Sequence, residues 1–191
     1  METNTLYPIF LKVRQLNVLI IGAGKVGTEK LHFLLKSSPD ANVEVVAYNF
    51  SDELVELAAF HSVSLKHKKF DFKDLDKRSI VIAATNDRFL NEQIYAECRK
   101  RNILINVADN PDLCDFYLGG IVTKQNLKIA ISTNGKSPTL AKRMRQYFEQ
   151  EIPDDVNGLL ENLSDYRGTL KGDFEMKLKA LNELTKNLIN N

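Results

Sequence analysis

Val18-Leu-Ile-Ile-Gly22-Ala-Gly24-Lys-Val-Gly27 carries the strongest structural signal in this chain. A short apolar run breaks into Gly-x-Gly-x-x-Gly, and a helical pattern begins near Val26. This order is typical of a dinucleotide-binding turn: the first glycine allows the turn, the second admits a pyrophosphate and the third lets the helix pack closely. The helix N-terminus then offers free N–H groups to phosphates. The stretch predicts a nucleotide cofactor, and the alternative is a tight turn that binds nothing.

The second strand should carry an acidic residue for the adenosine ribose, about twenty residues after the glycines. Here that strand ends in Tyr48-Asn49, and Asp52 comes late. Asn49 can hydrogen-bond a hydroxyl, but the missing acid leaves the choice between NAD and NADP open. The absence of Arg or Lys argues against a 2′-phosphate. The expected cofactor contacts are Gly22, Ala23, Gly24, Lys25, Val26, Gly27, Tyr48, Asn49, Thr85 and Asn86.

The composition is that of an ordinary soluble protein, with 191 residues, 43% hydrophobic and 27% charged. A formal net charge of +1 gives no whole-chain drive toward nucleic acid or membrane. No apolar run is long enough for a membrane span, and the N-terminus does not read as a signal peptide. We therefore expect a cytoplasmic protein in which Cys98 and Cys114 stay reduced, Cys98 as a small core residue.

Strand-like and helix-like segments alternate in the first half of the chain. Such alternation predicts an α/β fold with a Rossmann-like parallel sheet. The expected strands are Asn17–Ile21, Val43–Ala47, Val63–Leu65, Ile80–Ala84 and Ile103–Val107, and the expected helices are Val26–Leu35, Asp52–Phe60 and Asn91–Lys100.

The pattern changes after the fifth strand. Phe116–Thr123 and Leu127–Thr133 predict a β-hairpin with a three-residue gap, and Ser137-Pro138 starts a helix to about Gln150. The remainder to Asn191 is helical in pattern. In its last helix, apolar residues three or four apart make one face: Phe174, Leu178, Leu181, Leu184 and Leu188. We expect a nucleotide domain over 1–113, a dimerisation segment over 114–150 and a helical domain over 151–191.

Two strand ends carry polar residues where ligands of open α/β sheets bind. Ala83-Ala84-Thr85-Asn86-Asp87 lies at the carboxyl end of a buried strand, and Asp87 can either contact a ligand or cap the next helix. Asn106-Val-Ala-Asp109 ends the next strand. Asp109 can act as a general base or metal ligand, although in isolation a turn residue before Pro111 is the better interpretation.

The segment Ser132–Pro138 combines hydroxyls, a glycine and a helix start, as a substrate-holding loop would; the alternative is a plain connection.

Ile121–Phe148 contains six bases and no acid, whereas Glu149–Asp165 contains six acids and no base. Such runs are usually solvated faces, but a loop and a helix start suit a phosphate or polycarboxylate ligand. The expected substrate contacts are Ser132, Asn134, Lys136, Ser137, Lys142, Arg143 and Arg145. No Cys/His cluster has the spacing of a metal site.

Taken together, these segments resemble the siroheme synthase family, specifically its precorrin-2 dehydrogenases, over roughly Leu6 to Phe148. The segments that carry the resemblance are Tyr7-Pro-Ile-Phe-Leu, Val18–Gly27, Ala83–Asp87, Asn106–Asp109 with Phe116 beyond it, and Ile129–Pro138 followed by Leu140-Ala-Lys-Arg-Met-Arg. Departures are Asn134 in place of a glycine and Lys136 where a small residue is common. At 191 residues, we expect the chain to lack the methyltransferase domain of longer members.

The resemblance implies a homodimer that oxidises precorrin-2 to sirohydrochlorin with NAD, and in some relatives also inserts ferrous iron. It places the catalytic aspartate at Asp109 and the hydroxyl of the loop at Thr133. It also implies that the hairpin and the following helix exchange across the dimer axis. A chelatase alone, or a nucleotide-sensing regulatory module, is the rival function; the regulatory module would usually carry the missing ribose acid.

Overall fold

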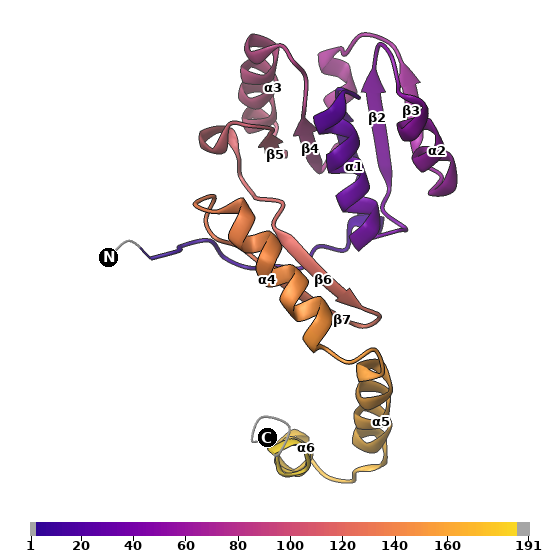
Figure 1. Ribbon diagram of the computed structural model, residues 1–191, viewed down its shortest axis with the longest axis vertical. Helices are drawn as coiled ribbons and strands as arrows, with labels where there is room; N and C mark the ends of the chain where they lie inside the picture. Colours follow the sequence, from indigo (N-terminus) through magenta and orange to yellow (C-terminus); the bar gives the residue numbers. More distant parts are fainter. Residues whose placement is uncertain (1–2, 187–191) are drawn as a thin grey trace. The chain divides into compact units, whose positions relative to one another are not determined.

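The computed structural model describes residues 3–186 as two compact units (Figure 1). The sheet unit comprises residues 3–119 together with residues 132–137. The hairpin unit comprises residues 120–131 together with residues 138–186. The chain therefore leaves the sheet unit, forms a hairpin, returns for one short loop and leaves again.

The sheet unit holds five parallel strands in the order β3-β2-β1-β4-β5. This is the order of the first five strands of a dinucleotide-binding sheet, so the predicted Rossmann-like fold is confirmed. The strands are β1 (Val18–Ile21), β2 (Val43–Ala47), β3 (Ser64–His67), β4 (Ile80–Ala83) and β5 (Leu104–Val107). The helices are α1 (Lys25–Ser37), α2 (Asp52–Phe60) and α3 (Arg88–Lys100), with short 3-10 turns at Val13–Gln15, Phe72–Leu75 and Pro111–Leu113.

Successive strand residues point to opposite faces of this sheet, so both faces are apolar, and helices cover both. Val18 and Ile20 pack with α1 and α2, including Leu31 of α1. Leu19 and Ile21 pack on the other face, against α3. All four residues of β1 and all four of β4 are buried, as expected for central parallel strands. The free thiol of Cys98 lies in the α3 core, where burial raises its pKa to about 12.

Side-chain caps set the starts of α2 and α3. Ser51 accepts a hydrogen bond from the Leu54 N–H at 3.3 Å, and α2 begins at Asp52 as predicted. Asp87 accepts from the Leu90 N–H at 3.0 Å, so α3 begins at Arg88, three residues before the predicted start. The predicted helix covered the body of α3 but missed its first turn, whose start is set by the Asp87 cap.

The hairpin unit contains β6 (Gly120–Lys124) and β7 (Leu127–Ile131), an antiparallel pair. The predicted first strand was too long, because residues 116–119 precede β6 and lie outside the strand. The predicted three-residue gap was also wrong: Lys124 pairs with Leu127, so only Gln125 and Asn126 form the turn. Gln125 has φ +51°, the left-handed backbone that such short turns require.

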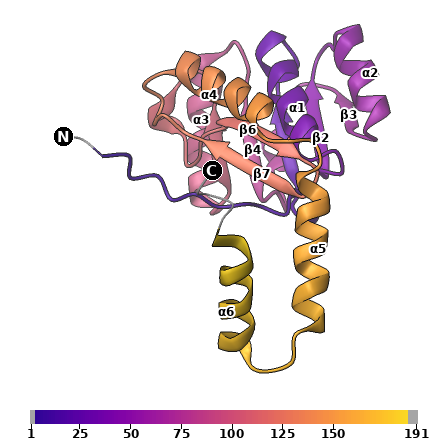
Figure 2. The same cartoon turned by 60° about the horizontal axis from the view of Figure 1, so that its bottom comes forward.

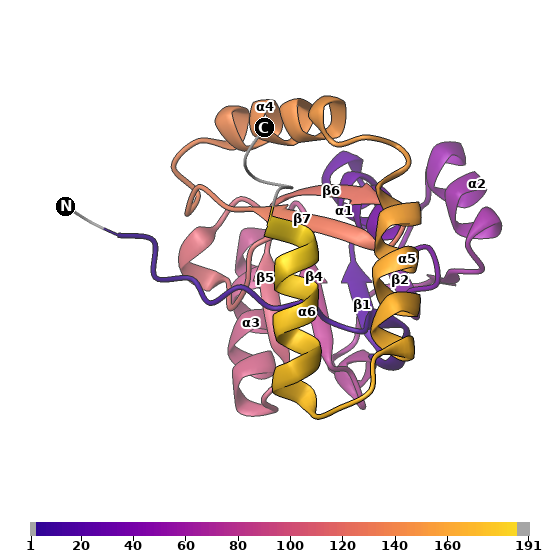
Figure 3. The ribbon, with the colours of Figure 1, turned by 90° about the horizontal axis from the view of Figure 1, so that it is seen from below.

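Three helices follow the hairpin: α4 (Pro138–Glu151), α5 (Val156–Thr169) and α6 (Phe174–Thr185). Helix α4 runs along one face of the hairpin and contacts both strands (Figure 3). Helices α5 and α6 lie side by side as a helical hairpin (Figure 2). The chain turns between these two helices at residues 170–173, and Leu188 of the predicted apolar face lies outside the described residues.

Among residues 3–186, no helix combines the length and apolar character that crossing a membrane demands.

We predict that Leu31→Ala lowers the free energy of unfolding by about 2–5 kcal/mol, because Leu31 is wholly buried between α1 and the sheet. Phe33→Ala on the same helix is the control: that ring is 49% exposed, and its loss should cost less than about 1 kcal/mol. Denaturant unfolding of both variants measures the difference. Equal losses would contradict the assignment of the buried helix face.

Candidate functional site

The glycine turn after β1 is held against the end of β4. Gly22 has φ +100°, and a Cβ added there would lie 2.4 Å from the Ala84 carbonyl oxygen. Its N–H donates to the Val46 carbonyl at 2.9 Å, which ties the turn to β2 as well. Only glycine satisfies both the backbone conformation and the space.

Gly24 and Gly27 have different roles at the start of α1. A Cβ on Gly27 would lie 2.1 Å from the Gly22 carbonyl oxygen, so the helix packs directly on the turn. A Cβ on Gly24 would meet no atom within 4 Å. Gly24 caps α1 without a side chain, and the first turn holds no acidic residue. The N-terminus of α1 therefore presents N–H groups to open space, as a pyrophosphate-binding turn requires.

The strand order places this turn where ligands of such sheets bind. β1 is flanked by β2 and β4, so the order of the chain reverses between β1 and β4. A crevice outside the carboxyl ends of the strands forms at this reversal. The small, buried residue Ala83 ends β4 there, and Ala84, also buried, follows it. The residues present thus fit a dinucleotide, with Gly22, Ala23, Gly24 and Lys25 lining the approach to α1.

Thr85 and Asp87 fix the backbone beyond β4. The Thr85 hydroxyl donates to the Asn91 side-chain oxygen at 2.6 Å, and the Asn91 amide donates back to the Thr85 carbonyl at 3.0 Å. Asp87 caps α3, which supports the capping interpretation over ligand contact for this residue. Asn86 is exposed between them and has a side chain available to a ligand.

The end of β3 adds residues that the sequence analysis missed. β2 and β3 pair in register, so His67 lies beside Ala47, next to Tyr48 and Asn49. The Tyr48 and His67 rings are 6.4 Å apart, and Tyr48 is 71% exposed. The predicted strand Val63–Leu65 stopped two residues short, which hid His67. The position of His67 follows from the register between β2 and β3, which no local motif in the sequence reveals.

Asp109 lies just beyond β5, in left-handed backbone with φ +61°. It is exposed, and within residues 3–186 its carboxylate has no hydrogen-bond or ion-pair partner. The loop beneath it is firmly anchored. Asn106, which is buried, donates from its side chain to the Phe116 carbonyl at 2.8 Å. The Cys114 thiol accepts from the Val107 N–H at 3.3 Å, and burial raises the pKa of that thiol. An anchored backbone with a free carboxylate suits proton transfer.

The loop between the hairpin and α4 belongs to the sheet unit. The Thr133 hydroxyl accepts from the Ser137 N–H at 3.2 Å, and the Ser132 hydroxyl accepts from the Asn134 N–H at 3.2 Å. Asn134 and Gly135 have φ values of +53° and +74°. Asparagine tolerates this conformation, which is how it replaces a glycine here. The Thr133 side chain therefore shapes the loop.

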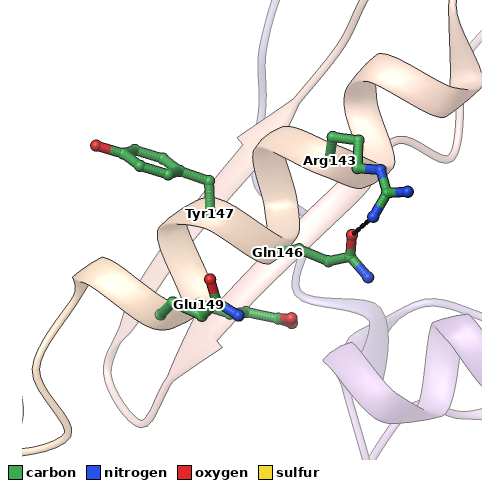
Figure 4. Close-up of a pocket in the computed structure, with 5 residues that line it drawn as sticks. Arg143, Gln146, Tyr147 and Glu149 are labelled. Carbon is green, nitrogen blue, oxygen red and sulfur yellow. Dashed lines mark hydrogen bonds between the residues drawn. The ribbon is translucent and has the colours of Figure 1, made fainter.

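The basic residues of α4 belong to the hairpin unit and differ in their pairing. Arg145 forms a two-pronged ion pair with Glu149, both N···O distances being 2.6 Å. Arg143 contacts Gln146 at 3.1 Å, and Lys142 is exposed. Figure 4 shows the shallow hollow that Arg143 and Gln146 share with Tyr147, Glu149 and Gln150. Lys142 and Arg143 thus keep a net positive charge for an anion, whereas Glu149 offsets that of Arg145.

No cluster of three His, Cys, Asp or Glu side chains able to hold a metal ion occurs in the described part of the chain.

Comparisons with known proteins agree with this geometry. The family described as "Putative NAD(P)-binding" matches residues 9–120, and the family described as "Sirohaem biosynthesis protein central" matches residues 124–151. Siroheme synthase 1 of Klebsiella pneumoniae is 38% identical over 86% of this chain and 34% of the relative. Siroheme synthase of Methylococcus capsulatus is 39% identical over 84% of this chain and 33% of the relative. The chain spans about a third of the length of these relatives.

A solved structure titled "SirC, precorrin-2 dehydrogenase" superposes with a TM-score of 0.72 and 26% identity, over 94% of this chain and 89% of that one. The fold and the glycine turn together define a dinucleotide-binding protein of the Rossmann class. The chain belongs to the NAD(P)-binding family matched over residues 9–120, and the resemblance to siroheme synthases drawn from its motifs is confirmed.

We predict that Gly24→Ala and Gly27→Ala separate ligand binding from folding. Gly24→Ala should fold with wild-type stability but bind NAD roughly tenfold more weakly, because its methyl group enters the open space before α1. Gly27→Ala should lose about 1–3 kcal/mol of stability through its clash with the Gly22 carbonyl. Calorimetric titration and thermal unfolding measure the two effects. Wild-type affinity in the Gly24 variant would exclude this turn as the pyrophosphate site.

Proposed function

We propose that this chain oxidises precorrin-2 to sirohydrochlorin with NAD, the dehydrogenase step of siroheme biosynthesis. The observation that carries the proposal is the likeness to a precorrin-2 dehydrogenase structure across both units, including the hairpin and the helices that follow it. A regulatory nucleotide-sensing module would share the glycine turn alone. The family match over residues 124–151 also favours the enzyme.

NAD, when bound, accepts the hydride that the macrocycle loses. The chain itself must orient the macrocycle and take up the accompanying proton. Asp109 is suited to the proton, because its free carboxylate lies at the carboxyl edge of the sheet, where the glycine turn also lies. The macrocycle carries several carboxylates, for which Lys142, Arg143 and the loop residues around Lys136 are suitable partners. Thr133 and Ser132 hold that loop in shape.

Ferrous iron insertion stays a prediction from the resemblance, with iron as a substrate of the same site. The cytoplasmic location likewise stays a prediction.

Asp109→Asn should lower turnover of precorrin-2 by at least about a hundredfold, because the amide cannot accept a proton. Asparagine suits the left-handed backbone of this position, so the fold and NAD affinity should be unchanged. Absorbance of NADH under anaerobic conditions measures turnover. The matched control is Asp112→Asn, an exposed aspartate three residues further on, which should keep wild-type turnover. Full activity in the Asp109 variant would refute its catalytic role.

We also propose that the chain forms a homodimer through α4. Leu140, Met144 and Tyr147 recur at the helical spacing, and they are 52%, 36% and 53% exposed. Another side of α4 packs on β6 and β7, so these three side chains form a second, largely exposed apolar face of the helix. A second copy of the chain would bury this face.

Leu140→Lys should shift the dimer to monomer, because a buried ammonium group without a partner opposes association. Analytical ultracentrifugation measures the change in mass. Gln150→Lys, on the polar side of the same helix, should remain dimeric. A monomeric wild-type protein at micromolar concentration would contradict the dimer.

A further inference from the structure

A thiol lies inside the turn that presents Asp109. The Asn110 N–H donates to the Val107 carbonyl at 3.2 Å, which closes a turn directly after β5. The Cys114 sulfur accepts from the Val107 N–H at 3.3 Å. The same sulfur lies 3.3 Å from the Val107 carbonyl oxygen and 3.2 Å from that of Asn110, and its proton is donated to one of them at a time. One thiol therefore contacts the backbone on both sides of Asp109.

The backbone of Asp109 needs such support. Asp109 is the third residue of the turn and has φ +61°, a combination that usually selects Gly or Asn. A residue with a Cβ stays in this left-handed conformation only where the surrounding contacts over-determine it. The Ala108 N–H donates to the Ala83 carbonyl of β4 at 2.9 Å, which holds the turn against the sheet. The Cys114 sulfur holds it from within.

The sulfur is itself held by the end of β5. The Asn106 side chain is buried, its amide nitrogen lies 3.4 Å from the Cys114 sulfur, and it donates to the Phe116 carbonyl at 2.8 Å. The Asp115 N–H donates to the Ile105 carbonyl at 2.8 Å, and the Asp115 carboxylate accepts from the Ile105 N–H at 3.1 Å. The segment that carries the thiol is therefore bonded to β5 at successive residues.

The Cys114 thiol is suited to holding backbone rather than to reacting. The thiolate is the reactive form of cysteine, and burial raises the pKa of this thiol. The group therefore keeps the proton that it donates to a carbonyl of the turn.

We propose that Cys114, held in place by Asn106, is a positioning residue for Asp109: the thiol fixes the turn that directs the Asp109 carboxylate toward the macrocycle. The inference rests on the proposed function, because it needs Asp109 to take up a proton from the substrate. It assigns the thiol an effect on the chemical step and none on NAD, whose glycine turn follows β1. Misplacing a reacting group by about 1 Å can cost on the order of a hundredfold in rate.

Steady-state kinetics of precorrin-2 oxidation, with titration calorimetry of NAD, test this on Cys114→Ala. We expect kcat to fall by at least about tenfold, whereas KM for precorrin-2 and Kd for NAD should change by less than about threefold, because the carboxylate is misplaced but present. Cys114→Ser should keep kcat within about threefold of the wild-type value, since a hydroxyl also accepts from an N–H and donates to a carbonyl.

Cys98→Ala is the matched control. It removes the other thiol of the chain, which is wholly buried in the α3 core, and should keep the wild-type kcat. Cys114→Val fills the space of the thiol without a hydrogen bond and should show the same loss as Cys114→Ala. It decides the test if the alanine variant does not fold, which circular dichroism measures for every variant.

A double variant shows whether the thiol acts through Asp109. In the Asp109→Asn background, Cys114→Ala should lower kcat no further, because the group that it positions is already lost. Two independent roles would instead multiply the two losses.

Wild-type kcat in folded Cys114→Ala or Cys114→Val, or multiplied losses in the double variant, would overturn the inference and leave the proposed function standing. A matching loss of kcat in Cys98→Ala, or weakened NAD binding in Cys114→Ala, would show a general structural effect and overturn it as well. Full turnover in Asp109→Asn, or wild-type protein that does not oxidise precorrin-2, would contradict the proposed function and this inference together.

Discussion

Three backbone segments meet where β1 and β4 end, and no side chain fits between them. The Gly22 turn lies against the Ala84 carbonyl, and α1 lies against the turn at Gly27. This contact fixes the start of α1, aims its free N–H groups and leaves open space in front of Gly24. It also joins the two halves of the sheet at the point where the strand order reverses. The cofactor site is thus a consequence of backbone packing.

The remaining features of the site are placed by the same sheet edge. Because the five strands are parallel, each contributes its carboxyl end: Asn86 after β4, Asp109 after β5 and the Tyr48–His67 pair after β2 and β3. The backbone of the loops after β4 and β5 is held by side-chain hydrogen bonds of Asn91, Asn106 and Cys114. The side chains offered to a ligand are therefore few and exposed, on a loop framework that is rigid.

The sequence predicted the elements whose signals are local. The apolar run of β1, the glycine spacing and the Ser51 cap each act within a few residues, and the corresponding elements were located to within a residue or two. Its failures at β6 and at His67 arose from partners that are distant in the sequence. The start of β6 depends on pairing with β7, so residues 116–119 looked strand-like and are not. His67 acquires its place only from the register with β2, and the charge of Arg145 is offset by Glu149, one helical turn away. The six basic residues between Ile121 and Phe148 therefore carry less uncompensated positive charge than their number suggests.

We propose that this framework couples a bound dinucleotide to the oxidation of precorrin-2. The most direct measurement is the stoichiometry of a single turnover, made anaerobically with wild-type protein, precorrin-2 and NAD. One NADH should form for each sirohydrochlorin, as followed by their separate absorbance bands. Sirohydrochlorin formed at the same rate without NAD, or protein that binds NAD yet forms no NADH from precorrin-2, would contradict it.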